Sequence, residues 1–207
     1  MKRLVLLIAC LMLVMTLGGC LVVGQKVNLG SATTGVSAVD GSAYYPLSVR
    51  VVENRYFVLT GEKEPSFIGK YRGGFGNPFD VNTEGNVPLA IQMERDLSTS
   101  LQRNGFSVVG DGAERNVKVS IDNYNFDCML NCQVWHLLQV VIEDNEGNAL
   151  HGHTVNIESV VDGNFFMGSK HYLEKELPVI YAKMLQDIVR NNPDAMAALQ
   201  RKPLGES

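Results

Sequence analysis

The spacing of apolar residues along the chain predicts an α+β fold. Apolar and polar residues alternate at 47–52 and again at 117–122, which is typical of strands with one buried face. An apolar run at 134–143, a glycine-containing turn at 145–148 and a returning run at 149–161 follow. The strand at 117–122 and these two runs are therefore expected to form a three-stranded antiparallel meander.

Apolar residues spaced three and four apart predict two main helices. The first is expected to begin at a cap formed by Asn86 and to end at the left-handed stop Asn104-Gly105. The second covers 172–189 and either kinks or begins at Pro178, because proline disrupts a helix interior. A last short helix is expected at 194–200.

Glycine and proline punctuate the region from Gly61 to Gly85, which predicts mostly loop with one short strand at 67–71. The cluster at 72–76 lacks the lysine of a phosphate-binding loop and no helix begins directly after it, so we interpret it as a turn. A strand starting at 106–109 is expected after the first helix. The predicted fold is an antiparallel sheet of about four to five strands packed against two main helices.

The first 19 residues have the order of a secretory signal peptide. A basic pair at 2–3 precedes an apolar run at 4–14, and one aliphatic residue and two glycines at 17–19 precede Cys20. An apolar run this short is below the roughly 20 residues that a helix needs to cross a bilayer. The segment at 17–20 resembles the lipobox of bacterial lipoproteins, in which the cysteine becomes lipidated and N-terminal after cleavage.

The resemblance to a lipobox implies a diacylglycerol on Cys20, with acyl chains such as palmitate. Two chains anchor a protein stably, because each buried methylene contributes roughly 0.8 kcal/mol. Leu21 follows the cysteine, whereas aspartate at that place favours inner-membrane retention in enterobacterial lipoproteins. We therefore expect attachment to the outer membrane on its periplasmic face, with the inner membrane and an ordinary secretory signal as alternatives.

Residues 20–43 are predicted to be the lipidated N-terminus and a flexible tether. The stretch from Gly24 to Ala43 is rich in small residues, has one acidic and one basic residue, and shows no sustained period. Twenty such residues reach roughly 25 Å if flexible. The alternative is a partly docked edge segment. Residues 44–207 are expected to form a single α+β domain in the periplasm.

The charge balance argues against a nucleic-acid partner. The chain has 18 basic and 22 acidic residues, and removal of the signal takes away two of the basic ones. An acidic mature chain without a basic stretch interleaved with aromatics offers no phosphate-neutralising surface.

Two cysteines remain as thiols after export and lipidation, because Cys10 leaves with the signal and Cys20 takes the lipid. Cys128 and Cys132 flank a short segment between two predicted strands, and opposite positions of a hairpin have a Cα separation that suits a disulfide. The exported compartment favours their pairing. We expect a disulfide at the tip of a hairpin, with a local role, and consider a metal or redox role the alternative.

No residue pattern demands catalysis or a cofactor. The serines lack a GxSxG setting and the mature cysteines are expected to bond to each other, so an enzyme is not expected. His151 and His153 lie two apart on a predicted strand and share a face that can bind zinc, with His136 on the facing strand as a third ligand. The alternative, which we favour, is partly exposed sheet histidines near a turn and no bound metal.

Several of these features together resemble the YajG family of uncharacterised bacterial lipoproteins. They are the lipobox, a strand that ends in a loop bearing Arg55, a helix that closes on Asn104-Gly105-Phe106, the long meander and the C-terminal helix. The resemblance covers most of the mature chain and is most specific at 89–109 and 134–185. The cysteine pair and the glycine-rich loop at 73–76 depart from the family.

The YajG family has no assigned chemistry, so the resemblance implies a lipoprotein and no reaction. Similar α+β layouts occur in auxiliary lipoproteins of envelope transport and assembly machines. A non-enzymatic scaffold or auxiliary factor that binds an envelope protein is therefore the expected function. The alternative is a periplasmic ligand- or metal-binding lipoprotein that uses His151 and His153.

Overall fold

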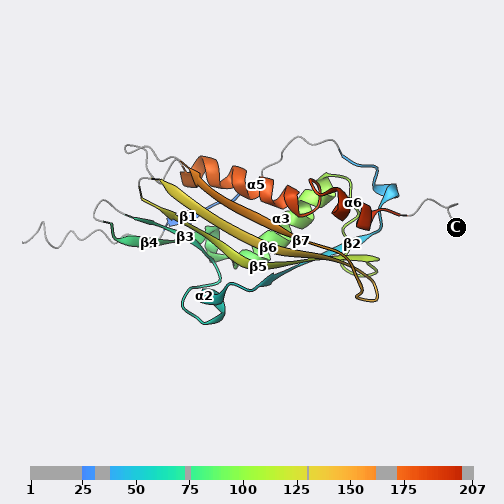
Figure 1. Cartoon of the computed structure of the whole chain (residues 1–207), viewed down its shortest axis with the longest axis horizontal. Helices are drawn as coiled ribbons and strands as arrows, with labels where there is room; N and C mark the ends of the chain where they lie inside the picture. Colours follow the sequence, from blue (N-terminus) through green and yellow to red (C-terminus); the bar gives the residue numbers. More distant parts are fainter. Residues whose placement is uncertain (1–24, 31–37, 73–75, 130, 162–171, 202–207) are drawn as a thin grey trace, which may run out of the picture.

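A mixed β-sheet with helices on one face forms the framework of the domain (Figure 1). The computed structural model describes residues 25–30, 38–72, 76–129, 131–161 and 172–201. The predicted signal peptide and Cys20 lie outside these residues. The α+β class is confirmed, but the sheet has seven strands in the order β1-β4-β3-β5-β6-β7, with β2 also paired to β5.

The strands differ greatly in length, and the last three are the longest. Their bounds are β1 Gln25–Val27, β2 Leu47–Glu53, β3 Phe67–Arg72, β4 Pro78–Thr83, β5 Arg115–Cys128, β6 Cys132–Asp144 and β7 Ala149–Val161. The helices are α2 Tyr56–Leu59, α3 Leu89–Arg103, α5 Leu177–Ile188 and α6 Pro193–Leu199, with short turns η1 Gly41–Ala43, η2 Glu84–Asn86 and η3 Tyr172–Glu176. In Figure 1, α5 and the short α2 lie on opposite sides of the strands.

The predicted meander is present as β5, β6 and β7, which pair antiparallel over almost their full length. Alternate residues of β5 and β6 are buried against the helices, so period two correctly identified one buried face. A bulge between Ile121 and Asn123 changes which residues face the core. The buried positions are Val117, Val119 and Ile121 before the bulge and Tyr124, Phe126 and Cys128 after it.

The expectation of a purely antiparallel sheet is wrong, because three strand pairs are parallel. They are β1 with β4, β2 with β5, and β3 with β5. The pairing of β2 with β5 requires a crossover connection, and α3 lies in it and packs against β2. Such pairings join segments far apart in sequence, so no local pattern reveals them. The expected strand at 106–109 is only an isolated bridge between Leu47 and Val108.

Part of the expected tether is packed onto the sheet. β1 pairs with β4 from Gln25↔Val81 onward, and Leu29 is fully buried. The alternative of a docked edge segment therefore describes residues 25–30 better than a flexible tether. Two apolar side chains, Val27 and Leu29, were enough to anchor a stretch whose composition is otherwise that of a linker.

The helix α3 agrees with the predicted amphipathic helix, but its cap does not. Pro88 precedes the first helical residue, and Asn86 takes a positive φ of 55° instead of capping. At the other end, Gly105 has a φ of 95° and the amide of Phe106 donates to the carbonyl oxygen of Leu101, as the left-handed stop requires. α5 begins at Leu177, so Pro178 lies in its first turn, where proline fits.

Two parallel strands pair with the same edge of β5, one after the other along its length. β2 pairs with it as far as Glu53↔Ile121, and β3 pairs with it at Lys70↔Asp127 and the next residue. The stretch of β5 between these two pairings includes the bulge. A gap in the ladder is therefore left between β2 and β3, and its backbone carbonyl groups need other donors.

The guanidinium group of Arg55 fills this gap. Its side chain is fully buried, and its NH groups donate to the carbonyl oxygens of Pro65, Phe67 and Tyr124. Its Nε and Nη2 form a bidentate pair with the Glu53 carboxylate at 2.7 and 2.6 Å. Arg55 therefore links the end of β2, the segment before β3 and the middle of β5. The sequence indicated an arginine after the first strand but not this role.

Replacing Arg55 by methionine is expected to lower the free energy of unfolding by about 3–5 kcal/mol, because the Glu53 carboxylate loses its buried partner and three carbonyl groups lose a donor. Urea unfolding followed by circular dichroism measures the change. Lys63→Met is the matched control, since the Lys63–Asp80 pair is partly exposed and contributes only about 0–1 kcal/mol. Equal losses in both variants would contradict the assigned role.

Candidate functional site

β7 is a long edge strand of the sheet among the described residues. β7 is 13 residues long, and within the described parts of the chain it pairs with β6 alone. An edge strand presents unpaired N–H and C=O groups that can accept another strand. The sequence of β7 contains no proline, lysine or arginine, which are residues that often block such edges.

The outer face of the sheet carries apolar side chains along β6. Trp135, Leu137 and Val141 are half-buried there, and polar residues flank them on the neighbouring strands. Trp135 lies between Asn125 of β5 and Glu158 of β7. β7 separates this stripe from the free edge, so a strand added to β7 would lie two strand spacings, or about 10 Å, from it.

The structure places His151 and His153 together and His136 elsewhere. The rings of His151 and His153 are 5.1 Å apart between centroids, on the face of β7 that is directed toward the helices. His153 is opposite Val140, four residues along β6 from His136. The registers of β6 and β7 thus separate His136 from the pair, and the structure does not bring together the three histidines named in the alternative.

No group of three or more His, Cys, Asp or Glu side chains suited to a metal occurs among the residues that the structure describes. Beside the histidine pair, a hollow of about 370 Å³ is lined by His153, Asp187 and Asn191 among others. The His153 Nε2 lies 3.4 Å from the carbonyl oxygen of Asp187. Burial is the main cause that lowers the pKa of His153. This shift favours the neutral form of His153 near pH 7.

His136 is a buried polar residue inside the core. It is 1% exposed, and its ring stacks on that of Tyr124 at 3.9 Å between centroids with an angle of 4°. Neither ring nitrogen has a hydrogen-bond partner within the described residues. Burial lowers the pKa of His136 to about 3, so the ring is neutral near pH 7. The sequence placed His136 on the correct strand but gave no sign of this environment.

The cysteine pair forms the expected disulfide at the tip of the β5–β6 hairpin. Cys128 and Cys132 are opposite each other, with Cα atoms 4.0 Å apart. Both are buried, whereas Met129 just beyond is 55% exposed. The bond fixes the hairpin end and leaves an apolar side chain projecting from it.

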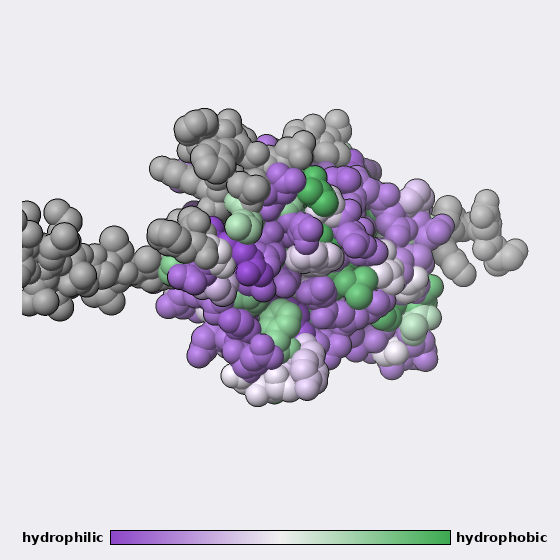
Figure 2. Space-filling view, turned by 60° about the vertical axis from the view of Figure 1, so that its left-hand side comes forward, coloured by the Kyte–Doolittle hydropathy of each residue, from purple (hydrophilic) through white to green (hydrophobic). Residues whose placement is uncertain are grey.

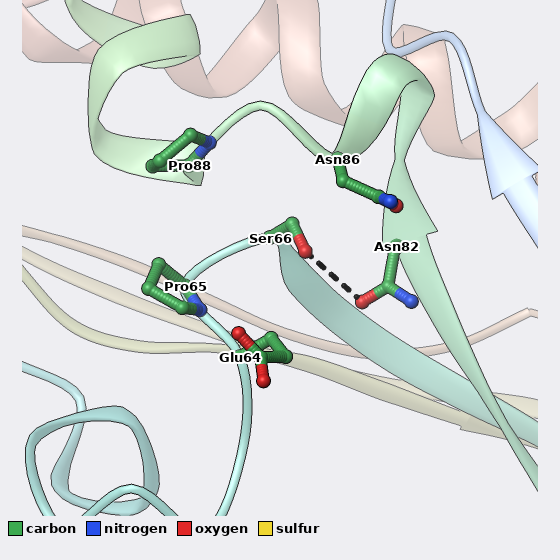
Figure 3. Close-up of a pocket in the computed structure, with 6 residues that line it drawn as sticks. All are labelled: Glu64, Pro65, Ser66, Asn82, Asn86 and Pro88. Atoms are coloured by element: carbon green, nitrogen blue, oxygen red, sulfur yellow. Dashed lines mark hydrogen bonds between the residues drawn. The ribbon is translucent and has the colours of Figure 1, made fainter.

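A shallow polar hollow of about 320 Å³ lies between the segment before β3, the end of β4 and the start of α3 (Figure 3). The Ser66 hydroxyl donates to the Asn82 amide oxygen at 3.3 Å. Figure 3 shows the Glu64 carboxylate pointing away from this pair. The neighbour of the hydroxyl is thus an amide and not a base, so this arrangement does not activate Ser66 as a nucleophile.

Known proteins resemble this chain in fold and not in sequence. No protein-family model matches the sequence, and no curated protein matches it. A crystal structure of a Xanthomonas campestris protein of family DUF330 is similar at a TM-score of 0.51 and 10% identity, covering 74% of this chain and 89% of that one. At this identity the likeness shows the fold alone.

Two further solved structures are similar at lower TM-scores. A minor lipoprotein from Acinetobacter baumannii has 14% identity and a TM-score of 0.43, covering 77% of this chain and 98% of that one. A PelC dodecamer from Paraburkholderia phytofirmans has 11% identity and a TM-score of 0.41, covering 74% and 92%. The resemblance to YajG lipoproteins stays a prediction. The described residues contain no helix long and apolar enough to cross a membrane.

The buried His136 is expected to make the domain less stable in acid. Its pKa is 6.5 when unfolded and about 3 when folded, so between these values the unfolded chain binds the proton and the folded one does not. Stability should therefore fall by roughly 1.4 kcal/mol per pH unit as the pH drops below 6.5. Urea unfolding at a series of pH values between 6.5 and 4.5 measures this slope.

His136→Phe keeps the ring and removes the titrating group, so most of the slope should disappear. His153, whose pKa is also lowered, leaves a smaller residual slope. At neutral pH the variant should gain about 1–2 kcal/mol, because an unpaired buried polar group is replaced by an apolar one. His151→Gln, at a partly exposed position of the same sheet, is the control. An unchanged slope in His136→Phe would refute this account.

Proposed function

We propose that this chain is a lipoprotein attached to the outer membrane through diacylglycerol on Cys20, and that it is a non-enzymatic scaffold or auxiliary factor in envelope assembly or transport. The lipobox-like segment at 17–20 supports the anchor. The free edge of β7 is the observation that carries the scaffold role. The fold shared with a DUF330 protein is compatible with this function but assigns none.

A partner binds this edge by adding a β-strand. In such complexes main-chain hydrogen bonds supply affinity, and alternate side chains supply specificity. On β7, alternate residues toward the helices are packed, and Val155 among them is buried. The exposed residues Thr154, Asn156 and Glu158 lie on the other face, beside the Trp135 stripe. A partner strand with polar residues facing Thr154, Asn156 and Glu158 fits this surface.

Photo-crosslinking in living cells tests the edge. A photoreactive residue at Asn156 is expected to give one major adduct with an envelope protein, because the position lies on β7 and is exposed. Ile91, 60% exposed on α3, is the matched control and should give no such adduct. Mass spectrometry of the adduct identifies the partner. Equal adducts at both positions, or none at Asn156, would remove the support for docking at this edge.

The anchor is tested separately. Cys20→Ser is expected to abolish incorporation of radiolabelled palmitate and to move the mature protein from the membrane to the soluble fraction, because the two acyl chains supply the binding energy. An unchanged circular dichroism spectrum would show that the substitution leaves the fold intact. A Cys20→Ser protein that stays with the membrane as firmly as the wild type would disprove the anchor.

A further inference from the structure

We propose that one end of the sheet, formed by the tip of the β3–β4 hairpin and the disulfide tip of the β5–β6 hairpin, contacts the phospholipid headgroups of the membrane. We call this the hairpin end, and its residues are Lys70, Tyr71, Arg72, Pro78, Phe79 and Met129. The inference rests on the proposed anchor at Cys20. It adds the orientation of the domain and a lipid-binding surface that the anchor alone does not require.

The length of chain between the lipid and the sheet carries the first step. β1 begins at Gln25, five residues after Cys20. Five residues span at most about 18 Å even when fully extended. The reach of roughly 25 Å expected for a 20-residue tether is therefore not available, because the chain is already fixed to the sheet at Gln25. The start of β1 must lie close to the membrane.

The strand registers give the second step, which is the direction. β1 is parallel to β4, with Gln25 opposite Val81. The start of β1 is therefore directed toward the beginning of β4 at Pro78. Pro78 lies three residues, or about 10 Å, before Val81, the partner of Gln25. This is the hairpin end, which lies at the left in Figure 1. An anchor that reaches about 18 Å beyond Gln25 brings Pro78 to the level of the headgroups.

The two hairpin tips lie at the same level. Tyr71 is opposite Phe79 in the β3–β4 pair and opposite Cys128 in the β3–β5 pair. One residue further on, Pro78 and Met129 therefore extend to a common height, and both are exposed. Two tips at one height form a surface that can rest on a bilayer, which a single projecting loop cannot do as stably.

The chemistry of the hairpin end suits a membrane interface. Met129 offers an exposed apolar side chain. The Tyr71 and Phe79 rings stack with their centroids 5.1 Å apart, one residue further from the tip than Met129. Lys70 and Arg72 share the Asp127 carboxylate at 3.3 and 2.8 Å. Figure 2, which brings this end forward, shows separate apolar patches among hydrophilic residues. Mixed apolar and basic groups favour the headgroup region.

The far end of the sheet is more acidic than the hairpin end. The turns at 110–114 and 144–148 contain four carboxylates, Asp111, Glu114, Asp144 and Glu146, and Arg115 is the basic residue that directly follows the first turn. At the hairpin end, Lys70 and Arg72 share the Asp127 carboxylate, and Asp80, opposite Lys70, pairs with Lys63, so acidic and basic groups nearly balance. An anionic bilayer therefore repels the far end more strongly than the hairpin end.

Lipid-side quenching of two single-cysteine variants tests the orientation. Asn77→Cys labels the hairpin end and Asn145→Cys labels the far end, and both positions are exposed asparagines next to turns. Each lipidated protein carries a fluorophore and is reconstituted in vesicles of phosphatidylethanolamine and phosphatidylglycerol that contain a spin-labelled lipid. Quenching at position 77 is expected to exceed that at 145 severalfold. Equal quenching, or stronger quenching at 145, would overturn the proposal.

A lengthened linker separates contact from mere proximity. Insertion of twenty Gly and Ser residues after Gly24 should leave quenching at position 77 dominant if the hairpin end binds lipid. Quenching that becomes equal at both positions would overturn the contact. In the protein with the lengthened linker, Met129→Glu is expected to reduce quenching at position 77 by roughly twofold or more. The substitution removes an apolar group and adds a negative charge. Leu59→Glu, 63% exposed on α2, is the control and should have no effect.

The mass of the purified proteins reports on the anchor independently. A protein that carries the diacylglycerol but shows equal quenching contradicts only the proposed orientation. A protein without that mass contradicts the anchor, and the orientation fails with it. Equal urea midpoints for the labelled variants confirm that neither substitution has disturbed the fold.

Discussion

The buried guanidinium group of Arg55 is the interaction on which the sheet depends. β5 has two edges, and one of them is shared by β2 and β3, which arrive from different directions in the chain. Two strands cannot meet end to end on a third without leaving carbonyl groups unpaired between them. Arg55 has the length to enter this gap and the five donors to satisfy several acceptors there, and Glu53 neutralises its charge. A lysine has neither the planar geometry nor enough donors for the same task.

Because Arg55 holds β3 against the second half of β5, the β3–β4 hairpin and the β5–β6 hairpin end at one side of the sheet. β1 then joins β4 in parallel, so the chain that leads back to Cys20 leaves from that same side. The far side collects the β6–β7 turn and the start of β5. The difference between the two ends, with exposed apolar groups at one and carboxylate-rich turns at the other, thus follows from strand registers as much as from composition.

Local features of the fold could be predicted from the sequence, whereas long-range ones could not. The meander, α3 with its stop at Gly105, and the disulfide each depend on neighbouring residues whose spacing has a direct physical meaning. β1 and β4 are too short for a periodic signal, and β4 begins with a proline. Their stability comes from pairing with distant strands. The helical cap was misplaced because Asn86 suits both a cap and a positive φ, and only the packing of η2 decides between them.

The candidate sites show the same division. The period of two residues placed His151 and His153 on one face correctly. The distance of His136 from this pair depends on how β6 and β7 align, and the residues of a single strand do not determine that register. Nothing in the sequence distinguishes His136, buried against Tyr124, from a histidine at the surface.

The orientation of the sheet has a consequence for the free edge. β7 ends at Val161, opposite Cys132 in the disulfide hairpin, so it runs from the far end toward the hairpin end. With the hairpin end on the membrane, a strand added to β7 extends away from the bilayer over 13 residues, or about 43 Å. The edge is then presented at a fixed angle and not on a loosely tethered domain, which lowers the orientational cost of docking a partner that is itself embedded in the membrane. On this proposal, the short link between Cys20 and β1 restricts which side of the sheet a membrane partner would meet.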